Sequence, residues 1–451
     1  MNALAPVFDY IDARHDDYVA RLMDYVKNPS ISAQNIGIRE VSELLVKMLG
    51  EMGMEVKSIP TKGHPFVLGR YEVDPGKPTI LLYGHYDVQP PEPLEEWLSP
   101  PFEPTIRDGR IWARGVGDNK GQHFAQLMAI EAHLAVHGTL PCNVIFLLEG
   151  EEEIGSPQIA EFVDTHRDEL KTDLVVTADG PLHESGRATM TYGVRGMTSF
   201  ELRVRTAKRD AHSGNYGGVM PNAIWTLVHL LGTMKTPEGE ITIEGLHDPI
   251  IPPSDADHDA VSKLPLDLAG YMENIGIDRL DAPADRAFWD RLMFHPTLTI
   301  NGLHGGYGGE GSKSVLPCEA VAKCDIRLVE AMTPDQVMDC VRAHVAKHAP
   351  EVEVIAMGGM LPSKTPIENS WGPVIQDAIE TARGEPPLVY PCTGGSLPDY
   401  VFTKILGVPA YVMPYANADE ANHAPNENME IKLFLEGIRT GAALLDRIGQ
   451  A

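Results

Sequence analysis

Long apolar stretches and positive charge are both scarce in this sequence. No uninterrupted apolar run is long enough to span a bilayer, so we expect no transmembrane segment. The formal net charge is −27, which argues against nucleic acid or an anionic membrane as a partner. The first 26 residues carry charge throughout and have no apolar core of the secretory kind, so we expect no secretory signal.

Cysteine is scarce as well, with five residues in a chain of 451. Their odd number and wide spacing match neither a disulfide framework nor a C-x-x-C motif. We therefore expect free, buried thiols in a reducing compartment, and we expect the protein to be cytoplasmic. The five are Cys142, Cys318, Cys324, Cys340 and Cys392.

The order of the expected elements indicates more than one domain, because 451 residues exceed what one hydrophobic core usually serves. Up to about residue 178, apolar strands alternate with amphipathic helices, which predicts a mostly parallel sheet covered by helices. The pattern changes near residue 190, where strand 197–206 alternates apolar and polar residues as a half-exposed antiparallel strand does. After residue 362 the first pattern resumes.

We therefore predict an α/β fold in which one domain is interrupted by another. Residues 1–191 and 363–451 form the helix-covered, mostly parallel sheet, and residues 192–362 form an inserted, lid-like α+β domain. Within the lid, 245–295 is rich in Asp and Pro and is predicted to be a further insertion. Helices are expected at 8–27, 37–53, 120–137, 157–170, 220–235, 334–348, 371–383, 397–406 and 429–447.

The segment TILLYGHYDVQP at 79–90 is the most informative stretch of the chain. Its apolar start predicts a buried strand, and His85 and Asp87 follow where that strand ends. Being two residues apart, they point to the same side of an extended chain. The imidazole can then bind a metal ion while the carboxylate fixes the ring. Taken alone, the segment is better explained as a strand-end histidine beside a surface aspartate, so other residues must decide.

Further acidic and histidine side chains follow other predicted strands or precede a predicted helix. They are Glu151, Glu152 and Glu153 after strand 142–149, Asp179 after strand 173–178, His423 after strand 409–414, and Asp118 before helix 120–137. Because the carboxyl ends of strands in an open α/β sheet share one edge, we expect these side chains to gather there. A helix N-cap would explain Asp118 and a solvated turn would explain the glutamates. Like charges at a ligand edge are costly, however, unless a cation neutralises them.

Two histidines, two aspartates and a glutamate make a plausible ligand set for two ions such as Zn²⁺. Two such ions can share a bridging carboxylate and a bridging water, whose pKa they lower. A neighbouring carboxylate that is not a ligand can then take the water's proton, and paired glutamates suit this division of roles.

Six motifs in order carry a resemblance to a known family. They are GHYDVQP at 84–90, ARGVGDNKG at 113–121, EGEEEIGS at 149–156, TADG at 177–180, RDAHSGNYGG at 209–218 and NHAPNE at 422–427. With them, the chain resembles the M20 metallopeptidases over essentially its whole length, and especially their carnosinase-like dipeptidase branch. The resemblance implies that His85 and Asp179 bind one metal ion, that Glu153 and His423 bind a second, and that Asp118 bridges the two.

The resemblance also implies catalytic roles close to the metals. Glu152 would be the general base and Asp87 would support His85. The family pattern has two glutamates before x-Gly-Ser, and Glu151 is an extra acid here, so the base assignment could be displaced by one residue. A cis peptide bond is implied after Asp118.

In the lid, the resemblance implies that His212 donates to the carbonyl oxygen of the substrate. In the family this histidine enters the partner subunit's active site, so we expect a homodimer that forms through the lid. Arg327 would bind the free carboxylate of the substrate, since a guanidinium suits that group. Gly395 and Ser396 would line the substrate pocket, as would Ser314, which stands where the branch usually has Thr.

We therefore predict hydrolysis of amide bonds in dipeptides or short peptides with a free C-terminal carboxylate, by a metal-bridging water that Glu152 activates. Zn²⁺ is the first choice of metal, and Mn²⁺ or Co²⁺ also suit the ligands. An N-acyl-amino-acid amidohydrolase or a desuccinylase is the alternative within the enzyme class, although the insertion at 245–295 favours the dipeptidase branch. A non-catalytic binding protein is a remote alternative. His123, His133 and His137 are expected to be solvated or capping rather than ligands.

Overall fold

The computed structural model describes residues 4–281 and 287–451, which form two compact units. The first unit contains residues up to Gly193, together with Lys364–Pro391 and Val401–Ala451. The second contains Val194–Ser363 and a short return segment, Cys392–Tyr400. The functional domains expected from the sequence, 1–191 with 363–451 and 192–362, remain a prediction. Among the described residues, no helix is both long and apolar enough to cross a membrane.

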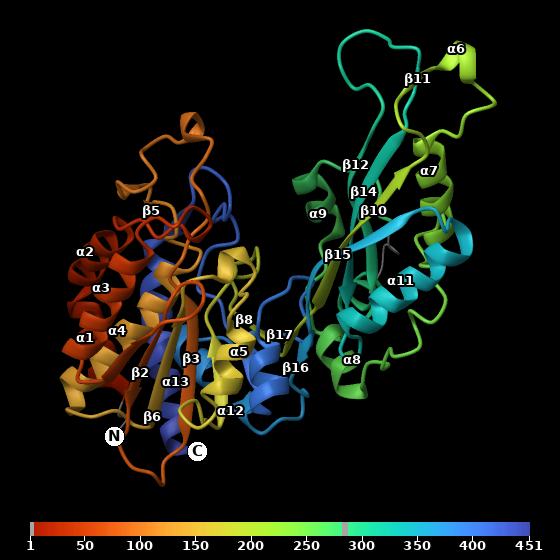
Figure 1. The fold of residues 1–451 in the computed structure, drawn as a ribbon. Helices are drawn as coiled ribbons and strands as arrows, with labels where there is room; N and C mark the ends of the chain where they lie inside the picture. The colour runs from red at the N-terminus through yellow and green to blue at the C-terminus, as the bar shows by residue number, and fades with distance from the viewer. Residues whose placement is uncertain (1–3, 282–286) are drawn as a thin grey trace. The chain divides into compact units, whose positions relative to one another are not determined.

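The first unit is built on an eight-stranded sheet, whose strands are coloured orange, yellow and blue in Figure 1. Its four central strands run parallel, and they are flanked by antiparallel pairs on one side and by mixed pairs on the other. The strand order is β1 (Glu55–Ile59), β2 (Phe66–Tyr71), β6 (Asn143–Glu149), β3 (Thr79–His85), β7 (Leu174–Thr177), β18 (Ala410–Val412), β8 (Thr189–Thr191) and β17 (Leu388–Tyr390). The predicted mostly parallel α/β sheet is therefore confirmed.

Both faces of this sheet are buried, as the unbroken apolar run of β3 requires. Ile80 and Leu82 point into a core shared with the helices, whereas Tyr83 faces the other way and packs against the ring of Phe402, 5.3 Å away. The helices that contribute to the shared core are α1 (Leu4–Ala13), α2 (His15–Val26), α3 (Ile38–Glu51), α4 (Lys120–His137), α12 (Trp371–Arg383) and α13 (Ile431–Gln450). On the other face, Phe162 of α5 (Ile159–Thr165) stacks on Phe66.

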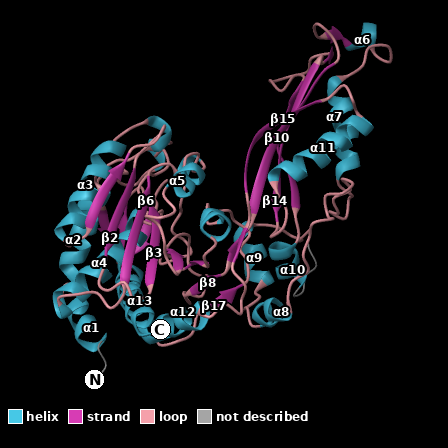
Figure 2. Cartoon of the chain, turned by 60° about the horizontal axis from the view of Figure 1, so that its bottom comes forward, coloured by secondary structure: helices cyan, strands magenta, loops and turns pink. Residues whose placement is uncertain are grey.

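The second unit is an antiparallel sheet with helices packed on it, which confirms the separate α+β fold predicted for the middle of the chain (Figure 2). Along its strand β10 (Gly196–Arg205), Phe200, Leu202 and Val204 are buried, while Arg203 and Arg205 are exposed. The strand order is β12 (Thr297–Gly305), β14 (Glu319–Leu328), β10 and β15 (Glu353–Met360), and the core is completed by α7 (Ala223–Met234) and α11 (Pro334–His348).

Several shorter elements differ from the expectation. The predicted helix 8–27 is two helices, because Arg14 leaves the helical conformation (φ −105°, ψ 9°) while the apolar face continues on both sides. The predicted insertion 245–295 contains α8 (Asp255–Ser262), α9 (Leu268–Ile275) and α10 (Ala287–Phe294), and its residues 282–286 lie outside the described residues. The predicted helix 397–406 is a π-helical segment, Val401–Leu406.

The remaining strands and helical turns are short. A three-stranded sheet joins β19 (Asn428–Glu430), β5 (Arg110–Trp112) and β4 (Thr105–Arg107). Two further pairs are β11 (Ala211–His212) with β13 (Val315–Leu316), and β9 (Gly193–Val194) with β16 (Ser363–Lys364). The helical turns are α6 (Ser213–Tyr216) and the 3₁₀ segments Ser32–Gln34, Leu94–Glu96 and Glu152–Ile154.

Candidate metal centre

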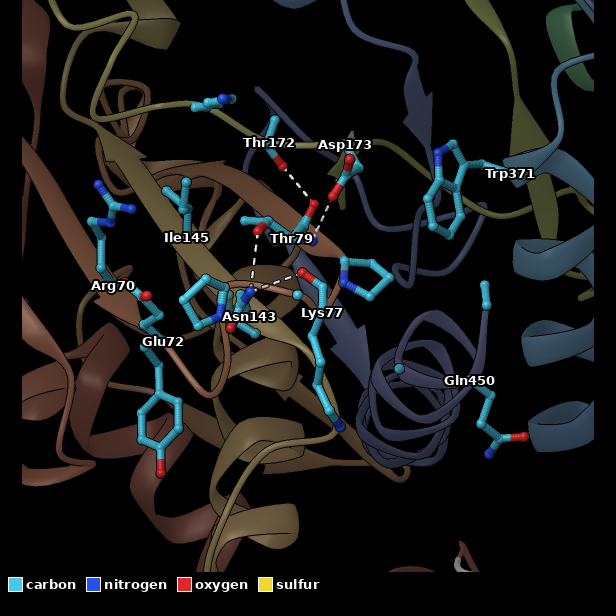
Figure 3. A pocket seen from close by; sticks show the side chains of 18 of the residues that line it. Arg70, Glu72, Lys77, Thr79, Asn143, Ile145, Thr172, Asp173, Trp371 and Gln450 are labelled. Carbon is cyan, nitrogen blue, oxygen red and sulfur yellow. Dashed lines mark hydrogen bonds between the residues drawn. The ribbon is translucent and has the colours of Figure 1, made fainter.

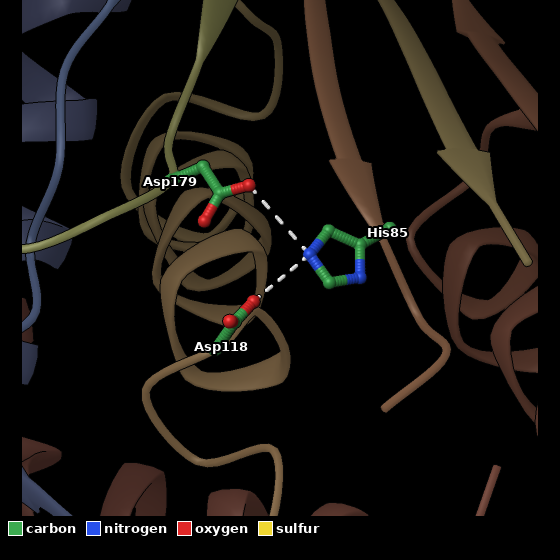
Figure 4. A group of neighbouring side chains, drawn as sticks. All are labelled: His85, Asp118 and Asp179. Carbon is green, nitrogen blue, oxygen red and sulfur yellow. Dashed lines mark ion pairs between the residues drawn. The ribbon is translucent and has the colours of Figure 1, made fainter. Parts of the chain in front are cut away.

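Three side chains meet at the carboxyl edge of the first unit's sheet (Figure 4). His85 is the last residue of β3, Asp179 follows β7, and Asp118 lies in the loop before α4. The Nε2 atom of His85 lies 3.1 Å from Oδ1 of Asp118 and 3.6 Å from Oδ2 of Asp179. His85 is fully buried, so these groups face one another with little water between them.

A second group uses the other oxygen of the same aspartate. The Nε2 atom of His423 lies 3.0 Å from Oδ2 of Asp118 and 3.2 Å from Oε2 of Glu153. Asp118 therefore directs one oxygen to each histidine. Two donor groups that share one carboxylate have the arrangement of a two-metal site with a bridging ligand.

Contacts of the next residue, Asn119, explain why Asp118 lies near the ends of β3 and β7. The peptide bond from Asp118 to Asn119 is cis, as the family resemblance implied. The Asn119 side chain accepts from the backbone N–H of His85 (3.3 Å) and donates to the carbonyl of Ala178 (2.6 Å). It thus ties the loop to the ends of β3 and β7. The helix cap of α4 is Asn119, so the N-cap explanation of Asp118 is wrong.

The electrostatics of the group indicate a shortage of positive charge. Burial and the nearby carboxylate of Asp118 raise the pKa of Glu153 to about 7, although His423 opposes this. Contacts with Asp118 and Glu153 raise the pKa of His423 to about 10. Burial lowers the pKa of His85, but the carboxylates of Asp118, Asp179 and Asp87 outweigh it and hold that pKa well above its usual range. The carboxylates thus favour the protonated, positively charged form of both histidines. A bound metal cation would supply this positive charge instead.

The donor set fits divalent metal ions. Nε2 of His85 is buried and makes no properly directed hydrogen bond, although two carboxylates lie close to it. An imidazole nitrogen surrounded by carboxylate oxygens is a usual ligand environment for Zn²⁺ and related ions. A cation would also neutralise buried acids that are otherwise costly to keep together.

Glu152 and Glu151 occupy different surroundings. Burial raises the pKa of Glu152 well above its usual range, and the carboxylates of Asp179, Asp118 and Glu153 raise it further against the influence of His85. A Cβ added at Gly63 would lie 1.9 Å from Oε1 of Glu151, and the strongest charged influence on Glu151 is His64. Glu152 therefore faces the carboxylate group, whereas Glu151 points toward residues 63–64.

Asp87 is buried and serves two neighbours. Its backbone carbonyl lies 3.1 Å from Nδ1 of His85, and its carboxylate lies 3.4 Å from the same atom. The two carboxylate oxygens accept from the backbone N–H groups of Glu152 (3.2 Å) and Glu153 (3.1 Å). Asp87 thus fixes the turn that carries both glutamates as well as the ring of His85, and a surface aspartate is excluded.

A separate polar group lies within the second unit. Nη1 of Arg327, on β14, donates to Oγ of Ser396 (2.8 Å). Arg195, which the sequence reasoning missed, holds the same segment: its Nε and Nη2 donate to the carbonyl of Gly394 (3.0 and 2.8 Å), and its backbone N–H donates to the carbonyl of Gly395. A charged residue inside the apolar and glycine-rich stretch YGVRGM was the available signal.

His212 and Ser314 also belong to the second unit and lie beside each other in its smallest strand pair. His212 pairs with Val315, and the backbone N–H of Ser213 donates to the carbonyl of Ser314 (3.1 Å). Both residues are exposed, and Nδ1 of His212 accepts from the backbone N–H of Gly214 (3.0 Å). The roles predicted for them remain predictions.

The expectation that three other histidines are solvated or capping is wrong for two of them. His123 and His133 are buried, because α4 is covered by its neighbours: every residue from Lys120 to Ile130 is buried, as are Ala132 and His133. His123 contacts the hydroxyl of Tyr25 (3.0 Å) and the side chain of Asn119 (3.2 Å), and Nε2 of His133 donates to the carbonyl of Ala442 (2.8 Å). Neither belongs to the two donor groups.

A cavity of about 820 Å³ lies at the opposite edge of the same sheet, where β3 and β6 begin (Figure 3). Asn143 donates to the carbonyl of Lys77, and Thr172 donates to the carbonyl of Thr79, so these polar groups are satisfied within the wall. No group of histidine and acid side chains of the kind seen at the carboxyl edge lines it among the described residues. The chemistry is therefore assigned to the carboxyl edge.

Comparison with known proteins decides the family. The sequence profile of Peptidase family M20/M25/M40 matches residues 81–447, which include all the residues of the two donor groups. The chain belongs to peptidase family M20/M25/M40. Its membership makes it a metallopeptidase, and the predicted resemblance is confirmed.

This M20 peptidase is similar along its whole length to proteins named as dipeptidases. It is 30% identical to a Cys-Gly metallodipeptidase of Schizosaccharomyces pombe, covering 97% of this chain and 96% of that protein. It is 29% identical to a beta-Ala-His dipeptidase of Homo sapiens, covering 99% and 93%. A solved M20 family metallo-carboxypeptidase of Sulfolobus solfataricus is 31% identical, with a TM-score of 0.90 over 96% of this chain and 99% of that one.

Proposed function

We propose that this M20 peptidase hydrolyses the amide bond of dipeptides or short peptides that carry a free C-terminal carboxylate, with two divalent metal ions. The observation that carries the proposal is that two donor groups share Asp118, and that Glu152, whose pKa is raised, faces the same carboxylates. The full-length similarity to two dipeptidases supports the substrate class.

His85 and Asp179 would hold one ion, Glu153 and His423 the other, and Asp118 both. When bound, the ions would polarise the scissile carbonyl and lower the pKa of the attacking water. Zn²⁺ is the preferred candidate because it favours nitrogen and oxygen ligands, and Mn²⁺ or Co²⁺ would suit the same set.

Glu152 is the proposed general base. Its burial and its acidic neighbours raise its affinity for a proton, which suits a group that must take one from water near neutral pH. It would then return the proton to the leaving amine. Asp87 would keep Glu152 in place, because its carboxylate accepts a hydrogen bond from the backbone N–H of Glu152.

Arg327 and Ser396 are proposed to bind the carboxylate of the substrate, together with Gly395 and Ser314. A guanidinium already oriented by a hydroxyl group is well suited to a planar anion. His212 is proposed to donate to the oxyanion that forms at the scissile carbonyl, a contribution of about 2.7–4 kcal/mol in comparable sites.

The proposed assembly is a homodimer formed through the second unit, with His212 acting in the partner's site. Exposed apolar side chains support a covered surface there: Trp225 and Val228 lie on α7, and Ile300 and Leu303 lie on β12. β12 is an edge strand of nine residues, and a long apolar edge is a usual place for association. The end of β12 adjoins α7, since a Cβ at Gly305 would lie 3.0 Å from Ile224.

A reducing compartment, as in the cytoplasm, is the proposed location. Among the described residues none of the five cysteines forms a disulfide, and Cys142, Cys318, Cys324 and Cys392 are buried. The net charge of −27 is the reason that neither nucleic acid nor an anionic membrane is proposed as a partner.

Hydrolysis of a substrate panel tests the proposal. The panel pairs each dipeptide with its C-terminal amide and with an N-acyl amino acid, and each is assayed with chelator and after return of Zn²⁺ or Mn²⁺. We expect chelator-sensitive cleavage of dipeptides and little cleavage of the amides. Preferred cleavage of N-acyl amino acids would replace the dipeptidase assignment with the amidohydrolase or desuccinylase alternative, and failure on every substrate would favour a binding protein.

Carboxypeptidase action on longer peptides is a second candidate, favoured by the similarity to the Sulfolobus solfataricus enzyme. Both activities need a free C-terminal carboxylate, so they differ only in how long a chain the site accepts. Adding tri- and tetrapeptides to the panel distinguishes them, because a dipeptidase loses activity sharply at the third residue and a carboxypeptidase does not.

A further inference from the structure

Glu427 is a fully buried acid whose two oxygens are both occupied by donors from a single loop. Oε2 accepts from Nη1 of Arg114 (2.7 Å) and from the backbone N–H of Gly115 (2.8 Å). Oε1 accepts from the backbone N–H groups of Gly117 (2.9 Å) and Asp118 (3.0 Å). The loop 114–118 thus wraps around one carboxylate.

These contacts make the arrangement specific to a carboxylate. A buried acid is costly unless its lone pairs are used, and here four donors use them. Arg114 is itself buried and lies over the ring of Trp97, with its guanidinium carbon 5.2 Å from the ring centroid. The backbone N–H of Ala113 also donates to the carbonyl of Glu427 (3.1 Å), so the two segments are joined at a further point.

The two joined segments each carry a proposed metal ligand. Asp118 is the last donor in the loop, and its own N–H is held by Glu427. His423 lies four residues before Glu427 in the motif NHAPNE. Glu427 therefore holds the backbone of Asp118 directly, and four residues of chain join it to His423, which lies 3.0 Å from Asp118.

We propose that Glu427 is a positioning residue that sets where the shared carboxylate of Asp118 stands relative to His423, and so sets the geometry of the metal pair. The proposal rests on the two-metal function proposed above. Supporting residues behind metal ligands commonly change metal affinity by about 10–100-fold when they are lost.

The alternative is that Glu427 only stabilises the fold. That role predicts a lower melting temperature with unchanged metal binding, because Asp118 would still reach its place in the folded protein. The two roles therefore differ in the affinity and the spectrum of the metal and not in stability.

The test compares Glu427→Gln with Glu430→Gln by equilibrium binding of Co²⁺ to metal-free protein and by the visible absorption of bound Co²⁺. Glu430 is a matched control: it lies three residues further on and accepts from Arg110 (2.9 Å) outside the loop 114–118. In Glu427→Gln, an amide N–H₂ must face a backbone N–H, so we expect about 10–100-fold weaker binding of at least one ion and an altered spectrum. We expect Glu430→Gln to match the wild type.

Glu427→Asp is the second variant, for the case in which the glutamine does not fold. It keeps the charge but withdraws the carboxylate by one methylene, so its Co²⁺ affinity should fall as well. Wild-type affinity and spectrum in whichever of the two variants folds would overturn the proposal. Since the readout is metal binding, a failure of the wild type to cleave dipeptides would contradict the proposed substrate without touching this test.

Discussion

At the scale of single residues, the chemistry depends on a carboxylate that serves two histidines. Asp118 lies 3.1 Å from His85 and 3.0 Å from His423, through different oxygens. Burial opposes its ionisation, but the contacts with His423 and His85 outweigh burial and lower the pKa of Asp118. The shared ligand therefore stays charged, while burial and the neighbouring carboxylates give Glu152 a higher affinity for a proton than an exposed glutamate has.

Replacing Glu152 with Gln should separate catalysis from metal binding. The amide keeps the size of the side chain but cannot take a proton, so kcat should fall by about 10²–10⁴ while both ions remain bound. Steady-state kinetics and metal analysis of the purified variant check this, and Glu151→Gln is the matched control that should keep near-normal turnover. Loss of turnover in Glu151→Gln alone would move the base by one residue.

Glu149 gives a prediction for stability against pH. Burial raises its pKa to about 8, from 4.5 in an unfolded chain. Between these values the folded protein keeps a proton that the unfolded chain has lost, so this term of stability is full below pH 4.5 and is lost as the pH rises to 8. The Glu149→Gln variant lacks the term. Relative to it, the wild type should lose about 1.4 kcal/mol per pH unit within this window.

Denaturant unfolding of both proteins with chelator present, at intervals from pH 5 to pH 8, measures that difference. A stability difference that stays constant across the window would show that Glu149 titrates normally in the folded protein.

Motif spacing could predict which residues gather, because strand ends in an open sheet share an edge. His85, Asp118, Glu153, Asp179 and His423 come together as that argument expects. It could not predict what lies behind them. Glu427 and Arg195 contact backbone atoms of distant segments, and a local pattern such as the arginine in YGVRGM can mark such a residue but cannot name its partner.

At the scale of elements, the position of the metal-binding loop depends on how α4 packs against α13. Lys120, the first residue of α4, directly follows Asp118 and Asn119, so a shift of this helix would also shift the loop. A Cβ added at Gly441 of α13 would lie 3.0 Å from Cβ of Ala129 on α4. The two helices are therefore packed closely at that point.

Gly441→Val should destabilise the protein by about 1–3 kcal/mol, since the added methyl groups must push α13 away from α4. Gly50→Val is the matched control in α3, because nothing lies within 4 Å of a Cβ there and the helix should tolerate it. Urea unfolding of the two variants checks the comparison. Equal stability would mean that the α4–α13 contact yields without cost.

Helices with clear end signals could be predicted to the residue. α11 begins at Pro334 after Thr333, whose side chain caps it, and α12 ends before Gly384 in the left-handed conformation. The three-residue strands β4, β5 and β19 are too short to show a period of two, and they pair only through the fold. The first helix is interrupted at Arg14, where no glycine or proline in the sequence indicates a break.

At the scale of the whole molecule, the proposed function needs more than one chain. His212 lies in the second unit, on the short strand β11, and its side chain is exposed. If it completes the site of a partner, then two different inactive chains should repair each other. The edge strand β12 and the exposed side of α7 offer the surface on which such a pair would form.

Mixing His212→Ala with Glu152→Gln after subunit exchange should restore activity. A mixed dimer has one site with both residues intact, so random pairing should recover up to about a quarter of wild-type activity. Each variant alone should stay at least about 10²-fold below the wild type. No recovery from a mixture shown by native mass spectrometry to contain mixed dimers would mean that His212 acts within its own chain or has no catalytic role.

Titration of metal-free protein with Zn²⁺, followed at once by metal count and by dipeptide hydrolysis, tests the central claim most directly. Two donor groups that share Asp118 predict that full activity is reached at two ions per chain, and that metal-free protein is inactive. Full activity at one ion per chain, or activity that survives complete removal of metal, would contradict the account.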